Sequence, residues 1–169
     1  MGKKTAATQA FTDLVCTNRA LRRASRRLGQ LYDEALAPMN LKATQVALLV
    51  EIDQFAAQDE GQGPTLQFLA GRLAILISAL THALRPLVRD AIVEVRPDAY
   101  DKRTKHAILT LLGRERLREA LVFWAAANRQ VEVVLGPGAV ATLHRLADEI
   151  ASDEFLAAYH DGQRLPGHS

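Results

Sequence analysis

The chain has 169 residues, of which 49% are hydrophobic and 24% charged, and its formal net charge at pH 7 is +2. This composition excludes a disordered chain, and the length favours a single domain over residues 1–169. The one cysteine, Cys16, excludes an internal disulfide framework and a four-thiolate metal site. No apolar run follows the N-terminal lysines or is long enough to cross a bilayer, so we expect a cytoplasmic protein without a membrane partner.

Helical patterns fill the first third of the chain. Leu14, Leu21 and Leu28 lie at heptad spacing and predict a helix over about residues 11–37, which a proline ends. Residues 43–56 predict a second helix that is apolar on most sides, so we expect it at the centre of the fold.

A helix-turn-helix is predicted after a loop at residues 58–64. Thr65 is a suitable N-cap for a short helix over TLQFLAGRL, and a second short helix follows over about residues 78–89. On this second helix, polar side chains that share an exposed face or its edges are candidates for DNA contacts: Ser78, Thr81, His82 and Arg85. The alternative interpretation is that Leu80, Leu84 and Leu87 form a buried stripe while the polar residues only meet water.

The spacing of apolar residues then changes to a strand pattern. Ile92, Val93 and Val95 precede a Pro-Asp turn, and residues 107–109 form an apolar run after a charged tip. This pattern predicts a β-hairpin.

Two further helices are predicted over about residues 114–135 and 140–158, separated by Gly-Pro-Gly, and residues 161–169 resemble a frayed tail. The apolar stripes of the first and the last two helices exceed what a small core can cover; they contain Leu14, Leu21, Leu117, Leu121, Trp124, Leu143, Leu146 and Ile150. We therefore expect a homodimer, whose two reading helices would lie about one helical turn of duplex apart.

From about Leu14 to Leu135 the sequence resembles the MarR family of winged-helix transcription regulators. The resemblance lies in LYDEALAPMNLKATQVALL, TLQFLAGRL, SALTHALRPLVRDAIVEV and DKRTKHAILTLLGRERL, and its most specific part is Asp101-Lys102-Arg103 followed by Leu109-Thr110 and Gly113. It implies a mainly α fold with a small β-hairpin wing. The winged helix-turn-helix region would span about residues 41–112, between dimerisation helices at about 10–37 and 114–158, with double-stranded DNA as the partner.

The resemblance also assigns roles in the wing. In the family an aspartate and an arginine at the positions of Asp101 and Arg103 pair and shape a loop along the DNA backbone, with the arginine at or near the minor groove. A guanidinium held by a carboxylate is preorganised to present its free donors to phosphate. Lys102 and Lys105 flank the pair and are further candidates for DNA contacts. A solvated turn is the alternative explanation for a charged hairpin tip.

Two positions depart from the family's pattern. Leu76 and Ile77 open the second short helix where the family carries acidic or polar and then basic residues, so we expect weaker binding or unusual specificity. Ala91 stands where the family has a glycine before the first strand. It must adopt the backbone angles of that glycine, or the turn has changed shape.

Cys16 lies on the same side of the first helix as an arc of arginines, namely Arg19, Arg22, Arg23, Arg26 and Arg27. Positive neighbours favour the thiolate that oxidants attack. Because the family contains one-cysteine organic hydroperoxide regulators, Cys16 is a candidate peroxide sensor. The alternative is a small apolar residue beside a solvated arginine face, and the tyrosine pair of that subgroup has no clear equivalent here.

The sequence favours a DNA-binding regulator, a repressor released by a small lipophilic or aromatic acid or by oxidation. Seven cations cluster in the segment that would meet DNA: Arg72, Arg85, Arg89, Arg96, Lys102, Arg103 and Lys105. The alternative is a winged-helix dimer that acts as a protein-interaction adaptor through its apolar helix start, with weak or no DNA binding.

No enzyme is predicted. The sequence contains neither a Gly-rich phosphate loop nor a nucleophile elbow. His144 and Asp148 lie one helical turn apart, but two ligands are a weak metal signal, so we expect no metal and no cofactor. His82 and His106 lie in elements expected to face DNA and are interpreted as contacting phosphate or solvent.

Overall fold

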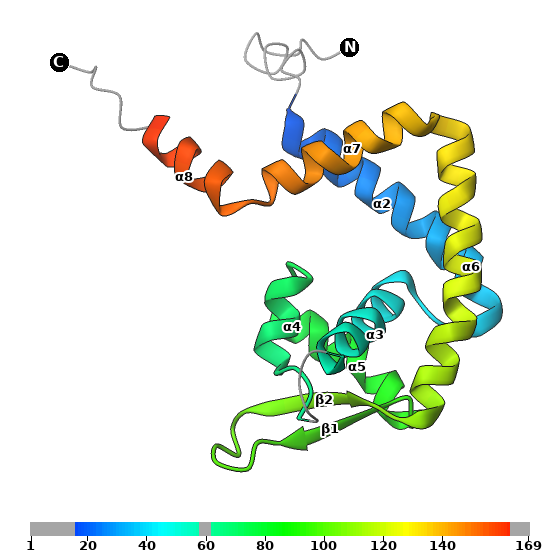
Figure 1. The fold of residues 1–169 in the computed structure, drawn as a ribbon, viewed down its shortest axis with the longest axis vertical. Helices are drawn as coiled ribbons and strands as arrows, with labels where there is room; N and C mark the ends of the chain where they lie inside the picture. Colours follow the sequence, from blue (N-terminus) through cyan, green and yellow to red (C-terminus); the bar gives the residue numbers. More distant parts are fainter. Residues whose placement is uncertain (1–15, 58–61, 163–169) are drawn as a thin grey trace, which may run out of the picture. The chain divides into compact units, whose positions relative to one another are not determined.

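The computed structural model of the protein describes residues 16–57 and 62–162 (Figure 1). Backbone contacts divide the chain into two compact units, residues 1–124 and 125–169. Leu14 and the predicted start of the first helix lie outside the described residues, as do parts of the predicted loop and tail.

The helices and strands follow the predicted order. They are α2 (Thr17–Leu36), the 3-10 turn η1 (Ala37–Met39), α3 (Ala43–Ala56), α4 (Leu66–Arg72), α5 (Ile77–Arg89), β1 (Val93–Pro97), β2 (Lys105–Leu109), α6 (Leu111–Leu135), α7 (Pro137–Ile150) and α8 (Asp153–Gly162). The strands pair antiparallel, so the mainly α fold with a β-hairpin is confirmed. Among the described helices, none is by itself long and apolar enough to cross a membrane; α4 and α5 pass such a test only as a pair, bent by 110°.

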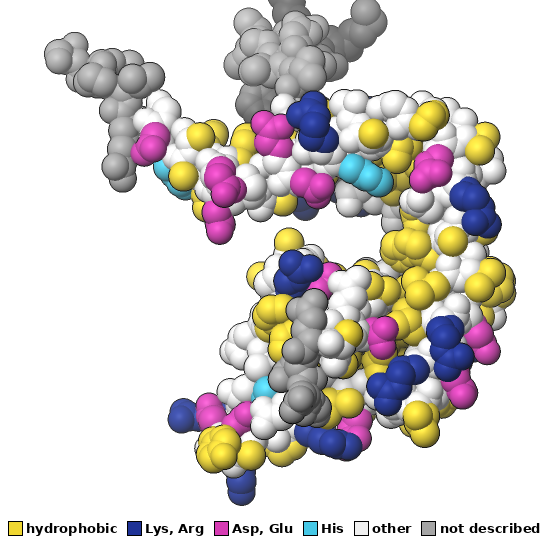
Figure 2. All heavy atoms as spheres, in the orientation of Figure 1, with side chains coloured by type: hydrophobic (Ala, Val, Ile, Leu, Met, Phe, Trp, Pro, Cys, Tyr) yellow, Lys and Arg dark blue, Asp and Glu magenta, His cyan; other side chains and the backbone are white. Residues whose placement is uncertain are grey.

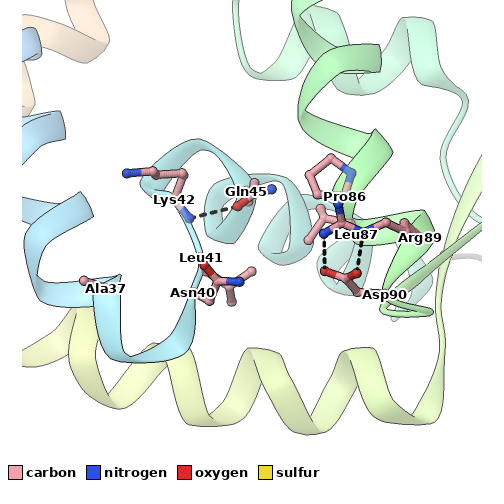
Figure 3. A pocket seen from close by; sticks show the side chains of 9 residues that line it. All are labelled: Ala37, Asn40, Leu41, Lys42, Gln45, Pro86, Leu87, Arg89 and Asp90. Carbon is pink, nitrogen blue, oxygen red and sulfur yellow. Dashed lines mark hydrogen bonds and ion pairs between the residues drawn. The ribbon is translucent and has the colours of Figure 1, made fainter.

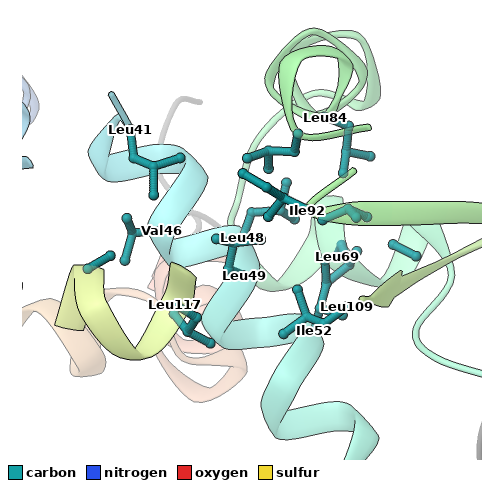
Figure 4. Packing of buried hydrophobic residues seen from close by; sticks show 14 of the residues in the cluster. Leu41, Val46, Leu48, Leu49, Ile52, Leu69, Leu84, Ile92, Leu109 and Leu117 are labelled. Carbon is teal, nitrogen blue, oxygen red and sulfur yellow. The ribbon is translucent and has the colours of Figure 1, made fainter. Parts of the chain in front are cut away.

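α3 lies at the centre of the apolar core, as its sequence predicts (Figure 4). Leu48, Leu49 and Ile52 of this helix have no exposed surface. Apolar residues of α4, α5, the hairpin and α6 join them in one cluster, among them Leu69, Leu80, Leu84, Leu87, Ile92, Val93, Ala107, Leu109 and Leu117. Each fully buried leucine or isoleucine stabilises the fold by roughly 1.5–3 kcal/mol, so this cluster holds the helix-turn-helix and the hairpin together.

A side chain from α2 caps the start of α3. Asp33 accepts a hydrogen bond from the backbone N–H of Ala43 at 2.7 Å and forms an ion pair with Lys42 at 3.4 Å. The side chain of Gln45, which is buried, accepts from the N–H of Lys42 at 2.9 Å and donates to the carbonyl of Ala83 at 3.4 Å. These contacts satisfy polar groups that a helix start would otherwise leave without partners.

α4 and α5 form the predicted helix-turn-helix. Thr65 caps α4 as predicted, since its side-chain oxygen accepts a hydrogen bond from the N–H of Phe68 at 3.1 Å. α5 begins at Ile77, one residue before the predicted start, and its three buried residues are the leucines of the proposed buried stripe. The turn between the helices places Ala74 at a φ of 50°, a left-handed conformation that the sequence pattern does not reveal.

The hairpin is attached to the segment that precedes α4. The N–H of Ala107 donates to the carbonyl of Pro64 at 3.0 Å. Gly63, with a φ of 73°, packs against the carbonyl of Ala107 so closely that a Cβ atom would collide with it. The hairpin therefore keeps a defined position on the helix-turn-helix, which a loop attached only at its ends would not have.

Ala91 adopts the left-handed conformation that is expected of a glycine, with a φ of 55°. The left-handed conformation costs a residue with a Cβ atom roughly 1–2 kcal/mol of conformational free energy, whereas glycine adopts it without this cost. The Ala91 side chain is exposed, so its removal loses little packing. Glycine also gives the unfolded chain more conformational entropy, which offsets part of this gain. We therefore expect Ala91→Gly to raise the free energy of unfolding by about 0.5–1 kcal/mol. Urea denaturation measures this difference, and a less stable variant would contradict it.

The prediction of one helix over residues 140–158 is wrong. α7 ends at Ile150 and α8 begins at Asp153. The reason is a local cap: the hydroxyl of Ser152 accepts a hydrogen bond from the N–H of Phe155 at 3.1 Å, and acidic residues fill the first turn of α8. α8 continues to Gly162, into the segment predicted to fray.

Leu117, a member of the predicted apolar stripes, is 4% exposed and belongs to the core cluster. α6 therefore covers the core of its own chain through its first turns. Other members of the predicted stripes remain 37–43% exposed, namely Leu21, Leu121, Leu146 and Ile150.

Candidate nucleic-acid interface

The four polar residues predicted to contact DNA lie on α5 and are exposed. They are Ser78, Thr81, His82 and Arg85, and the buried leucines occupy the other face of the helix. Thr81 uses its hydroxyl proton within the helix, where it donates to the carbonyl of Ile77 at 2.8 Å. An outside partner therefore meets the methyl group and an oxygen acceptor of Thr81, but not its donor.

Two aspartates shape the tip of the hairpin between β1 and β2. Asp98 accepts hydrogen bonds from the backbone N–H groups of Tyr100 at 2.8 Å and Asp101 at 2.9 Å. Asp101 accepts from the backbone N–H of Arg103 at 3.0 Å and from its Nε at 3.4 Å. The pairing of Asp101 with Arg103 that the resemblance implies is present, and the Arg103 side chain remains 96% exposed.

The interpretation of His106 as a contact for phosphate or solvent is wrong. Its Nδ1 lies 2.8 Å from the carbonyl oxygen of Gly63, and its Nε2 lies 3.0 Å from a carboxylate oxygen of Asp98. The side chain is only 12% exposed. Each ring nitrogen of His106 thus lies within hydrogen-bond distance of an acceptor oxygen. His106 thereby ties the hairpin tip to the loop that precedes α4.

Hydrogen bonds lower the pKa of Asp98. The backbone N–H of Asp101 has the largest effect, followed by that of Tyr100 and by the side chain of His106. The ionised carboxylate stabilises the fold above its ordinary pKa, and this contribution is lost as the pH falls through the depressed pKa of the folded state. Sequence reasoning missed this residue, although a Pro-Asp turn is a signal for an aspartate that accepts backbone hydrogen bonds.

Four of the seven clustered cations are paired with a neighbouring carboxylate. The pairs are Arg72 with Glu51 at 3.0 Å, Arg89 with Asp90 at 2.8 Å, Arg96 with Glu94 at 2.7 Å and Arg103 with Asp101 at 3.4 Å. Side-chain hydrogen bonds from the arginines lower the pKa of Asp90 and of Glu94. Arg85, Lys102 and Lys105 are exposed and form no ion pair within the described part of the chain. Figure 2 shows charges of both signs intermixed around the hairpin, so the positive surplus is smaller than the sequence indicates.

A hollow of about 310 Å³ lies between the start of α3 and the end of α5 (Figure 3). Its lining consists of Ala37, Asn40, Leu41, Lys42, Gln45, Pro86, Leu87, Arg89 and Asp90. This volume is near the lower limit for small-molecule sites. The cations of the lining already have partners, since Lys42 pairs with Asp33 and Arg89 donates two hydrogen bonds to Asp90. A bound anion would compete with these carboxylates.

Cys16 is exposed and occupies the N-cap position of α2. The arginines of the predicted arc are exposed on the first turns of the same helix. His144 and Asp148 are exposed on α7. Within residues 16–57 and 62–162, no group of three or more His, Cys, Asp or Glu side chains is arranged to hold a metal ion.

The structure is similar to those of transcription regulators solved with DNA. The Mycobacterium tuberculosis transcriptional regulator MosR in complex with DNA is 32% identical, with a TM-score of 0.66, over 89% of this chain and 99% of that one. A variant of Escherichia coli MarR with operator DNA is 24% identical, with a TM-score of 0.70, over 83% and 96%. The transcriptional repressor CouR, bound to a 23-mer duplex, is 22% identical, with a TM-score of 0.70, over 90% and 100%. No protein-family model and no curated protein matches the sequence.

Proposed function

The chain belongs to the MarR family of winged-helix transcription regulators, and from this premise we propose that it is a repressor that binds double-stranded DNA as a homodimer. In this proposal residues 41–112 form the DNA-binding region, and residues 10–37 and 114–158 supply the dimerisation helices. The solved structures that it resembles are regulators, and we propose no catalytic activity.

One observation carries the DNA-binding proposal: an exposed helix and a cationic hairpin tip belong to the same compact unit. α5 would enter the major groove, and the hairpin would follow the backbone with Arg103 at the minor groove. Arg85, Lys102 and Lys105 have no carboxylate partner within the described residues, so their charge is available to phosphates. Hydrogen bonds within the hairpin tip hold its backbone in one shape before DNA arrives.

The second unit supports the homodimer, because it has almost no core of its own. Among its described residues, Val140 is the one buried side chain. Most of its large apolar side chains are instead exposed, namely Val133, Val134, Leu135, Leu146, Ile150, Phe155, Leu156 and Tyr159. Helices with such an exposed apolar surface are stabilised when another apolar surface packs on them. A second copy of the chain has the same surface and can pack on it symmetrically.

A second candidate function is that of a protein-binding adaptor. The observation that favours it is the exposure of Leu76, at 76%, and of Ile77, at 47%, at the start of α5. Dependence on salt separates the two functions. Binding to DNA releases counterions from phosphates and weakens steeply as salt is raised, whereas binding through apolar side chains does not.

Release from DNA is proposed to follow either the binding of a lipophilic or aromatic acid or the oxidation of Cys16. The hollow beside α5 supports the first route, since Pro86 and Arg89 of the reading helix form part of its wall. Exposure of Cys16 supports the second, because an oxidant can reach the thiol. The variant Cys16→Ser separates the routes, since only oxidation requires the thiol.

Replacement of Arg103 tests the DNA-binding proposal. We expect Arg103→Ala to lower the affinity for a duplex selected from a random library by about tenfold, because one phosphate or minor-groove contact per protomer is lost. The dependence of affinity on salt should also become shallower by about one unit per protomer. Fluorescence anisotropy at about 50 and 200 mM salt measures both quantities.

The matched control is Arg118→Ala, which removes an exposed arginine from α6, outside the hairpin and α5 that would contact DNA. It should bind the duplex as the wild type does. Equal losses in the two variants would contradict the role of the hairpin, and affinity independent of salt would favour the adaptor.

A further inference from the structure

α5 opens with aliphatic side chains where a helix start commonly carries polar ones. Leu76 occupies the N-cap position and is 76% exposed, and Ile77 is the first residue of the helix and 47% exposed. Neither is among the buried residues of α5, which are Leu80, Leu84 and Leu87. Large exposed apolar side chains at a proposed binding surface need a physical reason.

The next turn of the helix continues this apolar character. Thr81 lies one turn after Ile77 and gives its hydroxyl proton to the Ile77 carbonyl at 2.8 Å. Thr81 therefore adds a methyl group to the exposed face without adding a free donor. The first turn of α5 thus has few side-chain donors for the polar edges of bases.

The surroundings of this apolar pair favour duplex DNA as its occupant. Residues 62–89 contain no Asp or Glu but three arginines, of which Arg72 and Arg89 pair with carboxylates outside this segment and Arg85 does not. Arg85 has no ion pair with a described residue and lies two turns after Ile77 on the same exposed face. A segment with this charge complements phosphate, and it surrounds an apolar centre too small for a stable protein interface.

In helix-turn-helix proteins, the first residues of the reading helix meet the base edges of the major groove. There thymine is the base that presents a methyl group, and apolar side chains recognise it by contact. We propose that Leu76 and Ile77 read thymine through its 5-methyl group, and that this pair sets the sequence preference of the protein. The inference rests on the proposed function and adds the chemical feature of DNA that is recognised.

Replacing thymidine by deoxyuridine tests whether the 5-methyl group is recognised, because deoxyuridine keeps the base pairing of thymine and lacks the methyl group. Duplexes are first selected from a random library with the wild-type protein, and each thymine of a selected half-site is then replaced by deoxyuridine. We expect one or two positions per half-site at which the replacement lowers affinity about fourfold, the value of one buried methyl-sized group.

The protein variants complete the test. Ile77→Ala and Leu76→Ala should bind thymine and deoxyuridine duplexes equally at those positions, since the contact is already lost. Val88→Ala is the matched control, because Val88 is an exposed aliphatic residue at the other end of α5, and it should discriminate as the wild type does.

Two results would overturn the inference. If the wild type binds every deoxyuridine duplex as tightly as its thymine counterpart, the methyl group is not read, while the proposed function stands. If no duplex is selected, or if selected duplexes bind without dependence on salt, the proposed function fails and the inference fails with it.

Discussion

Leu156→Asp is expected to dissociate the proposed homodimer and to lower duplex affinity by about 100-fold or more. Leu156 is 54% exposed on α8, a helix of 10 residues in which no residue is buried. A helix this short is marginal in water, so the apolar face of α8 needs a covering surface to remain ordered. A carboxylate buried beneath that covering surface would have neither water nor a positive partner. The free-energy cost of burying this charge is large enough to separate the subunits.

Affinity for the duplex falls because the two DNA-binding regions are no longer joined to each other. In the proposed homodimer two reading helices would bind two half-sites together, and the second contact would form at a high effective concentration. A monomer has only one reading helix and the weaker affinity of a single half-site. Sedimentation velocity gives the oligomeric state of the variant, and anisotropy gives its affinity.

Ala157→Asp is the matched control for this experiment. It adds the same charge to α8 on the face away from Phe155, Leu156 and Tyr159. This variant should remain a dimer with the affinity of the wild type. A dimeric Leu156→Asp protein would show that α8 does not contribute to the interface.

Gly113→Ala is expected to lower the free energy of unfolding by about 2–3 kcal/mol. Gly113 lies in the first turn of α6, and a Cβ atom there would collide with the backbone carbonyl of Ile92. Backbone cannot move aside as the end of a flexible side chain can. The Ile92 carbonyl also accepts hydrogen bonds from Thr110, so a shift of this carbonyl disturbs the junction between the hairpin and α6.

Thermal unfolding measures the effect, and we expect a fall in Tm of about 5–10 °C. Gly71→Ala is the matched control: Gly71 belongs to α4, and a Cβ atom there has no neighbour within 4 Å. The control should be as stable as the wild type or slightly more stable, because alanine favours helix. A Gly113→Ala protein as stable as this control would show that the junction has room to adjust.

Local signals in the sequence predicted much of the fold. The polar hydroxyl of Thr65 before an apolar stretch predicts the cap of α4, which its hydrogen bond to Phe68 confirms. For Ala91 the resemblance left two outcomes open, glycine-like backbone angles or a changed turn, and its φ of 55° shows the first. The cap of α4 could be predicted because Thr65 and its partner are close neighbours along the chain.

Contacts between distant segments could not be predicted in this way. The sequence places His106 in an element expected to face DNA, but its ring nitrogen lies within hydrogen-bond distance of the carbonyl of Gly63, 43 positions earlier. The pattern of the apolar stripes does not show which of their residues the chain's own core covers, and Leu117 is one that it does cover. The ion pair of Arg72 with Glu51 removes part of the charge that the sequence appeared to offer to DNA.

The sequence by itself determined which segments are helical or extended and which faces are apolar, whereas the pairing of Asp101 with Arg103 was implied by the resemblance to the family. These properties depend on the spacing of residue types along the chain and on neighbours a few positions away. Only the tertiary structure decided which cations remain without a carboxylate, which leucines the core covers and which side chains stay exposed at the start of α5. Those properties depend on which distant segments pack together, and a one-dimensional pattern does not specify the partners.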